Sequence, residues 1–196
     1  SGETFESNPI VVRKKVDENI YWGNLHNHTW YSECWGDDLD TFFSFAKNIS
    51  CLDYTAVSDH IYKKPSSEKS YRNNRLLKYR LGKEVTGLQA WIDTVNKAEY
   101  YNRENEFVTL VGYEWSSLDS GHYNVYVKKH SVEDLDRIFT EKFTDFSFKM
   151  RKLLKTTDAL LIPHVQSRMF PYLSLIQEKN DQGQPMTPVI EAYSDW

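Results

Sequence analysis

The alternation of short apolar runs with amphipathic stretches constrains the fold of this 196-residue chain more than any other feature. The runs that predict strands are Tyr21–Leu25, Tyr54–Val57, Phe107–Tyr113, Tyr123–Val127, Ala159–Ile162 and Val189–Tyr193. Helices are predicted where apolar residues recur three or four positions apart, over Leu39–Ile49, Leu88–Tyr101, Phe146–Leu154 and Leu173–Glu178. This alternation indicates an α/β domain around a mostly parallel sheet, either open or closed into a barrel, with Tyr123–Val127 as an inserted or hairpin strand.

Length and composition fit a single globular domain. Hydrophobic residues make up 40% of the chain, and no repeat or Pro/Gly-rich linker divides it. We expect residues 1–20 to form an N-terminal extension and residues 21–196 to form the domain. No apolar run predicts a membrane span, and the start lacks the apolar core of a signal peptide. That start is either a mature end left by processing or a trimmed end, so the compartment stays open. Cys34 and Cys51 are expected to be free thiols.

The net charge of −4 is unevenly distributed along the chain. The segment Lys63–Lys83 holds eight Lys or Arg residues and one acid, so it carries +7 and leaves −11 on the rest. Such a segment either gathers anionic substrate or is a solvated loop without that role.

Side chains that bind metals or protons follow four of the predicted strands: His26 and His28, then Asp59 and His60, then Glu114, then His164. In both parallel architectures, catalytic groups collect beyond the carboxyl ends of the strands. His26 and His28 are two positions apart in an extended segment, so they face the same way and can bind one ion. Imidazole and carboxylate ligands suit zinc, manganese or iron, and one carboxylate can bridge two ions. One such strand end alone would more often be structural, but four together predict a metal site.

This ordered series resembles the PHP (polymerase and histidinol phosphatase) superfamily. The segments that carry the resemblance are NLHNHTWYSE, AVSDH, the strand-end Glu114 and the PH of His164, within about Tyr21 to Tyr193. The resemblance implies a distorted (βα)7-type barrel and a site for two or three divalent ions, Zn, Mn or Fe. The segments YWGNLHNHT, GYEW and HYNVYV are most similar to an uncharacterised branch of that superfamily, so no substrate is carried over from it.

The resemblance also implies a role for each matching residue. His26, His28, His60 and His164 would bind ions, Glu114 would bridge them, and Asp59 would be a ligand or would orient one. Glu33 stands where the family has Asp and would keep its charge. His122 either matches the family's next histidine or ends a turn after Gly121.

The family pattern ends with an Asp-x-His near the last strand, and no such motif precedes Trp196. We therefore expect a barrel that is incomplete at its C-terminus, with residues 21–196 as a fragment that lacks the last strand.

The resemblance implies phosphoester hydrolysis, in which metal ions lower the pKa of a bound water and neutralise charge as the leaving oxygen departs. The expected catalytic residues are Glu114 and Arg168. Arg168 would bind a phosphate as a bidentate donor, or it caps a helix or pairs with an acid. The expected partner is a small phosphorylated, anionic substrate.

Two alternatives stay open. The protein could be a nuclease or nucleotide phosphodiesterase, with bases stacked on Trp30, Tyr31, Trp35 or Trp115, although an acidic body disfavours extended duplex binding. It could also be a metal-binding domain without turnover, which the missing last motif favours. Hydrolysis by Ser or Cys is disfavoured, because no GxSxG is present and Cys34 has no evident base besides the same histidines.

Overall fold

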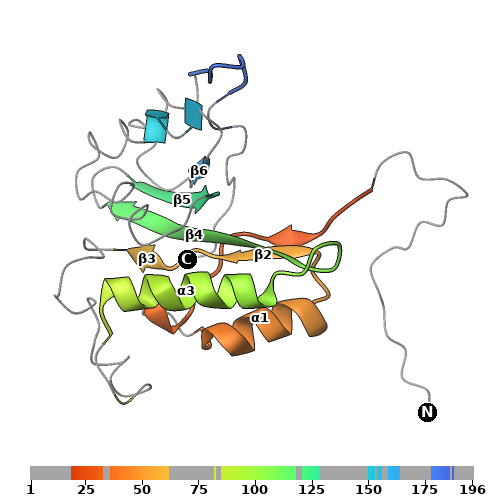
Figure 1. Cartoon of the computed structure of the whole chain (residues 1–196). Helices are drawn as coiled ribbons and strands as arrows, with labels where there is room; N and C mark the ends of the chain where they lie inside the picture. The colour runs from red at the N-terminus through yellow and green to blue at the C-terminus, as the bar shows by residue number, and fades with distance from the viewer. Residues whose placement is uncertain are drawn as a thin grey trace, which may run out of the picture.

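A computed structural model of the chain describes residues 19–32, 36–61, 82, 85–117, 121–128, 150–152, 154–155, 159–163, 178–185 and 187 (Figure 1). Its helical elements are η1 (Trp30–Ser32), α1 (Leu39–Asn48) and α3 (Gly87–Tyr101). Its strands are β1 (Gly23–Asn24), β2 (Tyr54–Val57), β3 (His60–Ile61), β4 (Val108–Ser117), β5 (Gly121–Val127) and β6 (Ala159–Pro163). In the part of the chain that is described, no helix is long and apolar enough to cross a membrane.

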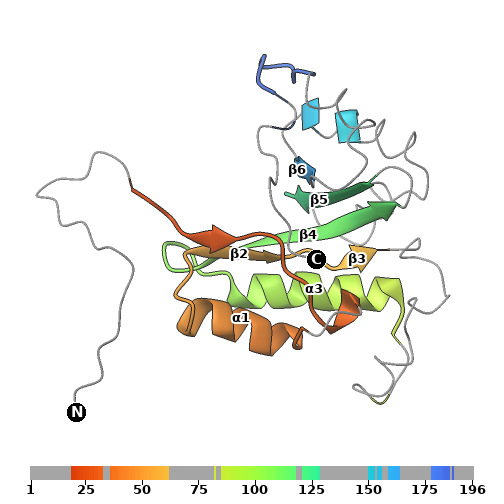
Figure 2. The same ribbon diagram turned by 180° about the vertical axis from the view of Figure 1, so that it is seen from behind.

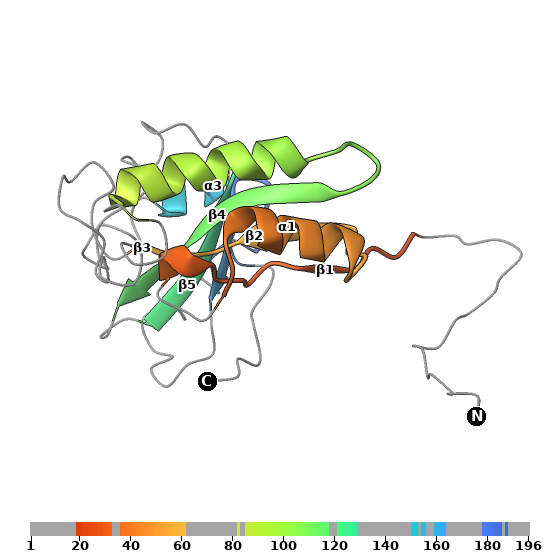
Figure 3. The same ribbon diagram turned by 90° about the horizontal axis from the view of Figure 1, so that it is seen from below.

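The strands form one mixed sheet in the order β1-β2-β4-β5-β6, and β3 pairs with β4 beyond the end of β2. The β1–β2, β2–β4 and β3–β4 pairs are parallel, whereas β4–β5 and β5–β6 are antiparallel. The sheet curls, so that Tyr126 on β5 donates a hydrogen bond of 2.5 Å to the carbonyl oxygen of Leu25, just after β1. Helices α1 and α3 lie side by side on one face of the sheet (Figures 2 and 3).

The predicted (βα)7-type barrel is therefore wrong: the described residues form a mixed sheet curled into half a barrel, with few helices. The reason lies between β4 and β5, which only residues 118–120 separate. A parallel connection needs a dozen residues or more, so these two strands can only form an antiparallel hairpin. The hairpin expected for Tyr123–Val127 is confirmed.

Both long helices begin at the residues that the sequence pattern predicts, within one position. The side chain of Asp38 accepts a hydrogen bond of 3.0 Å from the backbone N–H of Thr41 and so caps α1. Thr86 caps α3 in the same way through the N–H of Gln89, at 3.1 Å. Most of Phe146–Leu154 and Leu173–Glu178, and all of Val189–Tyr193, lie outside the described residues. The boundary after residue 20 and the incomplete C-terminus stay predictions.

Side chains alternate across β4 and give the sheet two distinct faces. Val111, Tyr113 and Trp115 pack with α1 and α3 in the main core, on what we call the helix face. The inner face is the opposite one, and there β4 presents Gly112 and Glu114. Its smaller apolar cluster of Ala56, Tyr126 and Ile162 lies with Leu25, Leu110 and Leu160. Glu114 thus projects from the centre of the sheet on the face that the helices do not cover.

Candidate metal centre

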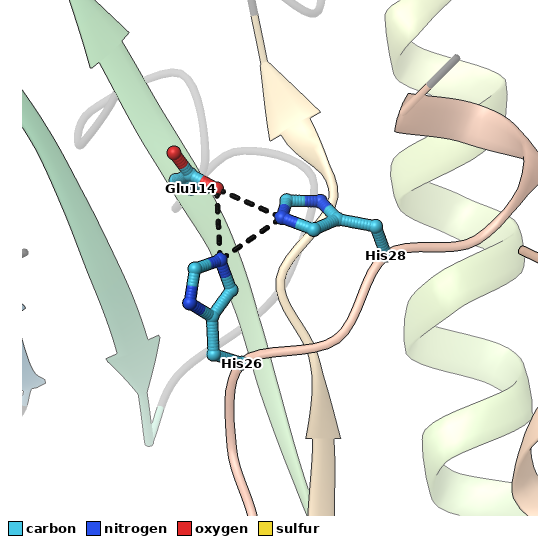
Figure 4. A group of neighbouring side chains, drawn as sticks. All are labelled: His26, His28 and Glu114. Carbon is cyan, nitrogen blue, oxygen red and sulfur yellow. Dashed lines mark hydrogen bonds and ion pairs between the residues drawn. The ribbon is translucent and has the colours of Figure 1, made fainter. Parts of the chain in front are cut away.

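Glu114 lies at the centre of a cluster of four histidines, on the inner face of the sheet. The whole residue is buried, with 0% of its surface exposed. Its Oε2 atom lies 3.3 Å from Nε2 of His26 and 3.1 Å from Nε2 of His28 (Figure 4). Its Oε1 atom lies 3.3 Å from Nδ1 of His60 and 2.5 Å from Nδ1 of His122. One carboxylate therefore contacts four imidazoles, two through each oxygen.

The segment after β1 places His26 and His28 because Asn27, between them, is bound to the strand beside it. Asn27 donates a side-chain hydrogen bond of 2.9 Å to the carbonyl oxygen of Ala56, and its backbone carbonyl accepts one of 2.8 Å from Ser58. With Asn27 turned toward β2, the two histidines turn the other way, and their Nε2 atoms lie 2.9 Å apart.

His60 and His122 reach Glu114 from the two strands beside β4. His60 is directly opposite Glu114 in the parallel β3–β4 pair. His122 is opposite Ser116 in the β4–β5 hairpin, one inner-face position further along. Ser116 lies between them, with its Oγ 2.7 Å from Nδ1 of His60 and 3.3 Å from Oε1 of Glu114.

Asp59 lies behind the cluster, where its backbone carbonyl oxygen accepts a hydrogen bond of 3.0 Å from the N–H of Glu114. Its side chain makes no hydrogen bond to Glu114 among the described residues. Its carboxylate accepts hydrogen bonds from the backbone N–H and the hydroxyl of Thr29, at 2.7 and 2.6 Å, and from the hydroxyl of Ser32, at 2.6 Å. Burial raises the pKa of Asp59, and these hydrogen bonds oppose that rise. Of the two roles considered for Asp59, ligand or orienting residue, the geometry favours the second.

The hydroxyl of Ser32 determines which ring nitrogen of His28 carries the proton, and therefore whether Nε2, which faces Glu114, has a free lone pair. Ser32 has one hydroxyl hydrogen, which it donates to Oδ1 of Asp59, and its oxygen accepts the backbone N–H of His60 at 2.7 Å. Nδ1 of His28 lies 2.9 Å from the same oxygen, so it must donate, and the proton of the neutral ring is on Nδ1. Nε2 then carries the lone pair that a metal ion needs.

The electrostatics of the cluster keep Glu114 ionised and His60 neutral. Burial alone would raise the pKa of Glu114, but the imidazoles around it, His122 above all, outweigh that effect and hold the pKa far below its ordinary value. Burial lowers the pKa of His60 to about 4, and the nearby Glu114 offsets only part of that shift. At neutral pH the cluster therefore presents a carboxylate and at least one uncharged imidazole, the protonation states in which these side chains bind metals.

Two overlapping groups in the described residues have the composition of a metal site: His26, His28 and Glu114, and His60, Glu114 and His122. In the first group the donor atoms lie 2.9 to 3.3 Å apart. Nitrogen and oxygen ligands about 2.0–2.2 Å from one ion are separated by about 2.9–3.5 Å, so this spacing fits. Glu114 Oε2 is buried and accepts no hydrogen bond of normal geometry in the described part. The first group therefore fits a divalent ion, and Oε1, the other oxygen of Glu114, allows a second ion with His60 and His122.

Of the predicted site residues, the structure brings together His26, His28, His60, Glu114 and His122. Glu33, His164 and Arg168 lie outside the described residues, as do Trp35 and all of Lys63–Lys83 except residue 82. Tyr31 and Trp115 are 9% and 1% exposed and pack in the core, so neither offers a face to a nucleobase.

Sequence reasoning missed the residues that hold the cluster in place. These are Ser32 and Thr29, which hydrogen-bond to Asp59. It also missed Asn124, which lies beside the cluster, opposite Glu114 in the β4–β5 pair. The available signal for Asn124 was its spacing of two from His122, which puts both side chains on one face of a strand.

A family model described as "Protein of unknown function (DUF3604)" matches residues 54–166, more than half of the chain. The matched range includes Asp59, His60, Glu114 and His122, whereas His26 and His28 precede it. No curated protein matches the chain.

Proposed function

We propose that this chain, which belongs to the DUF3604 family, is a metal-dependent phosphoesterase whose metal centre is the Glu114 cluster. The observation that carries the proposal is a buried carboxylate in contact with four imidazoles. The motifs that resemble the PHP superfamily also supply these residues, and the resemblance supports phosphoesters as the substrate class. The proposal concerns the site and its chemistry and does not include the barrel that was expected around it.

The residues of the chain would bind the ions and keep them in place. His26, His28 and Glu114 would hold one ion, and His60 and His122 would hold a second against the other oxygen of Glu114. Asp59 and Ser32 would keep His28 in the tautomer that binds. Bound ions would supply a hydroxide at neutral pH and neutralise charge on the phosphoryl group.

The burial of Tyr31 and Trp115 removes two of the four aromatic side chains considered for base stacking, which needs exposed aromatic faces. Trp30 is half-buried, and Trp35 lies outside the described residues. A small phosphorylated molecule remains the proposed substrate. The alternative is a domain that binds metal but does not catalyse hydrolysis, and the experiment below distinguishes the two.

The test is a hydrolysis assay on protein purified without chelator or histidine tag and then loaded with Zn²⁺, Mn²⁺ or Fe²⁺. p-Nitrophenyl phosphate and bis-p-nitrophenyl phosphate would report monoester and diester cleavage. We expect metal-dependent hydrolysis of at least one of them, abolished by chelator and by His28→Ala, and retained by the matched surface variant Asp38→Ala. Binding of metal without hydrolysis of either ester, or of a wider panel of both classes, would contradict the proposal.

A further inference from the structure

We propose that the side-chain oxygen of Asn124 is part of the metal centre and faces the bound ion or a water that the ion carries. This inference rests on the proposed function, because it requires the Glu114 cluster to bind metal. It adds an uncharged oxygen to a set of donors that otherwise consists of imidazoles and one carboxylate.

The register of the sheet places Asn124 beside the cluster. Asn124 is directly opposite Glu114 in the antiparallel β4–β5 pair, so both side chains project from the inner face. The Cβ atoms of residues opposite each other in such a pair are about 4.5–5.5 Å apart. Asn124 is also two positions from His122 on β5, which puts it on the same face as that histidine. It therefore lies next to two of the proposed ligand residues.

Among the residues that the structure describes, the side-chain oxygen of Asn124 has no hydrogen-bond partner that would explain a buried amide at this position. On β6 its opposite residue is Ile162, and the next inner-face residue along β5 is Tyr126, both of the apolar cluster. Only 1% of Asn124 is exposed, and its Oδ1 accepts no hydrogen bond from any residue that the structure describes. A buried acceptor without a partner is costly, and an aliphatic side chain would fit these neighbours without that cost.

A cation accounts for this oxygen and for Glu114 Oε2 together. Both are buried acceptors without a hydrogen bond of normal geometry in the described part, and their residues face each other across one strand pair. Asn and water oxygens are ordinary ligands of divalent ions, and a metal-bound water is a strong hydrogen-bond donor. Either partner would satisfy Asn124 Oδ1.

The experiment compares metal binding by wild-type protein and three variants: Asn124→Leu, Asn124→Asp and Tyr113→Phe. Asn124→Leu removes the oxygen at similar volume, and Asn124→Asp keeps it. Tyr113→Phe is the matched control, since it removes a buried hydroxyl that makes no hydrogen bond among the described residues and projects from the helix face. The readouts are Zn²⁺ affinity, the visible spectrum of bound Co²⁺ as a function of pH, and the melting temperature in chelator.

We expect Asn124→Leu to keep the melting temperature in chelator and to lower Zn²⁺ affinity about 10-fold or more, as loss of a metal-centre partner does. Asn124→Asp and Tyr113→Phe should bind close to wild type. A Co²⁺ spectrum that differs at every pH indicates a direct bond to the ion, and a shift of its pH transition alone indicates contact through bound water. Unchanged affinity and an unchanged spectrum in Asn124→Leu would overturn the inference. Wild-type protein that binds no ion would instead overturn the proposed function.

Discussion

Replacing Gly112 by alanine should destabilise the protein and loosen the segment that carries the first two histidines. Gly112 is opposite Tyr126 in the β4–β5 pair, and the tyrosine ring lies across the space that a side chain would take. A Cβ at residue 112 would lie 2.5 Å from Cδ1 of Tyr126 and 2.6 Å from the carbonyl oxygen of Val125. The ring belongs to a residue that is only 4% exposed, and the oxygen is backbone, so neither can move freely.

The structure allows the size of this effect to be worked out. Overpacking of a buried site costs about 1–3 kcal/mol. If the ring shifts, the 2.5 Å hydrogen bond from Tyr126 to Leu25 is also lost, which adds about 1 kcal/mol. The total is about 2–4 kcal/mol, and a chain of this length changes its melting temperature by about 2–4 °C per kcal/mol, so we expect a decrease of about 4–16 °C.

The assay is thermal unfolding in chelator, with Zn²⁺ affinity measured in parallel. Leu25 is adjacent to His26, so the affinity of Gly112→Ala should fall along with its stability. In a Tyr126→Leu background the ring is absent, and the same glycine substitution should cost less by about 1 kcal/mol. A melting temperature equal to that of wild type, or strictly additive effects in the double variant, would refute the close approach of Gly112 and Tyr126.

Three further predictions follow from individual contacts. Tyr126→Phe should lower stability by about 1 kcal/mol and weaken Zn²⁺ binding, because the carbonyl of Leu25, just before His26, loses its hydrogen bond. The control Tyr113→Phe should change neither stability nor Zn²⁺ affinity. Equal Zn²⁺ affinities of Tyr126→Phe and wild type in calorimetric titration would contradict a role of Tyr126 in positioning His26. In chelator, the free energy of unfolding should fall by up to about 3 kcal/mol as the pH drops from about 6.5 toward 4. The cause is that the folded-state pKa of His60 lies at about 4, so over this range the unfolded chain binds more protons than the folded protein. Urea titrations across this range should give a flatter profile for His60→Gln, and an increase in stability on acidification would contradict the assignment. Asp38→Ala should cost about 1 kcal/mol by removing the cap of α1 while leaving Zn²⁺ affinity unchanged; a loss of affinity would show that the cap and the metal centre are coupled.

Local sequence signals predicted the individual elements well, since their causes are local. β2 has the predicted bounds Tyr54–Val57, and α1 and α3 begin within one residue of the predicted positions because Asp38 and Thr86 cap them. The first strand was predicted over Tyr21–Leu25, but β1 covers only Gly23–Asn24. Tyr21 and Trp22 are 64% and 70% exposed. Apolar character alone did not reveal that these two residues lack a partner surface in the described part of the structure.

The direction of the strands was the main error, because hydrophobic periodicity does not distinguish parallel from antiparallel neighbours. The three-residue connection between β4 and β5 was visible in the sequence and excluded a helical crossover there. The rule that catalytic groups collect at strand ends still identified four residues that lie together: His26, His28, His60 and Glu114. His122, which also contacts Glu114, was suggested by the family resemblance, with a turn after Gly121 as the alternative.

The partners of these residues could not be predicted, because they depend on register between distant segments. Thr29 and Ser32 meet Asp59 across about thirty residues of chain, and Asn124 faces Glu114 only through the pairing of β4 with β5. Such contacts follow from strand order, which a single sequence does not specify.

The central claim is that Glu114 and its histidines bind divalent ions, and metal content per chain tests it most directly. Wild-type protein and Glu114→Gln would be dialysed against Zn²⁺ or Mn²⁺, separated from free ions and measured by mass spectrometry, with circular dichroism to verify that both are folded. We expect at least one ion per chain in the wild type, and two if both donor groups are filled. Folded Glu114→Gln should retain little or none. A wild type without bound metal, or a Glu114→Gln protein that binds as much as the wild type, would contradict the claim.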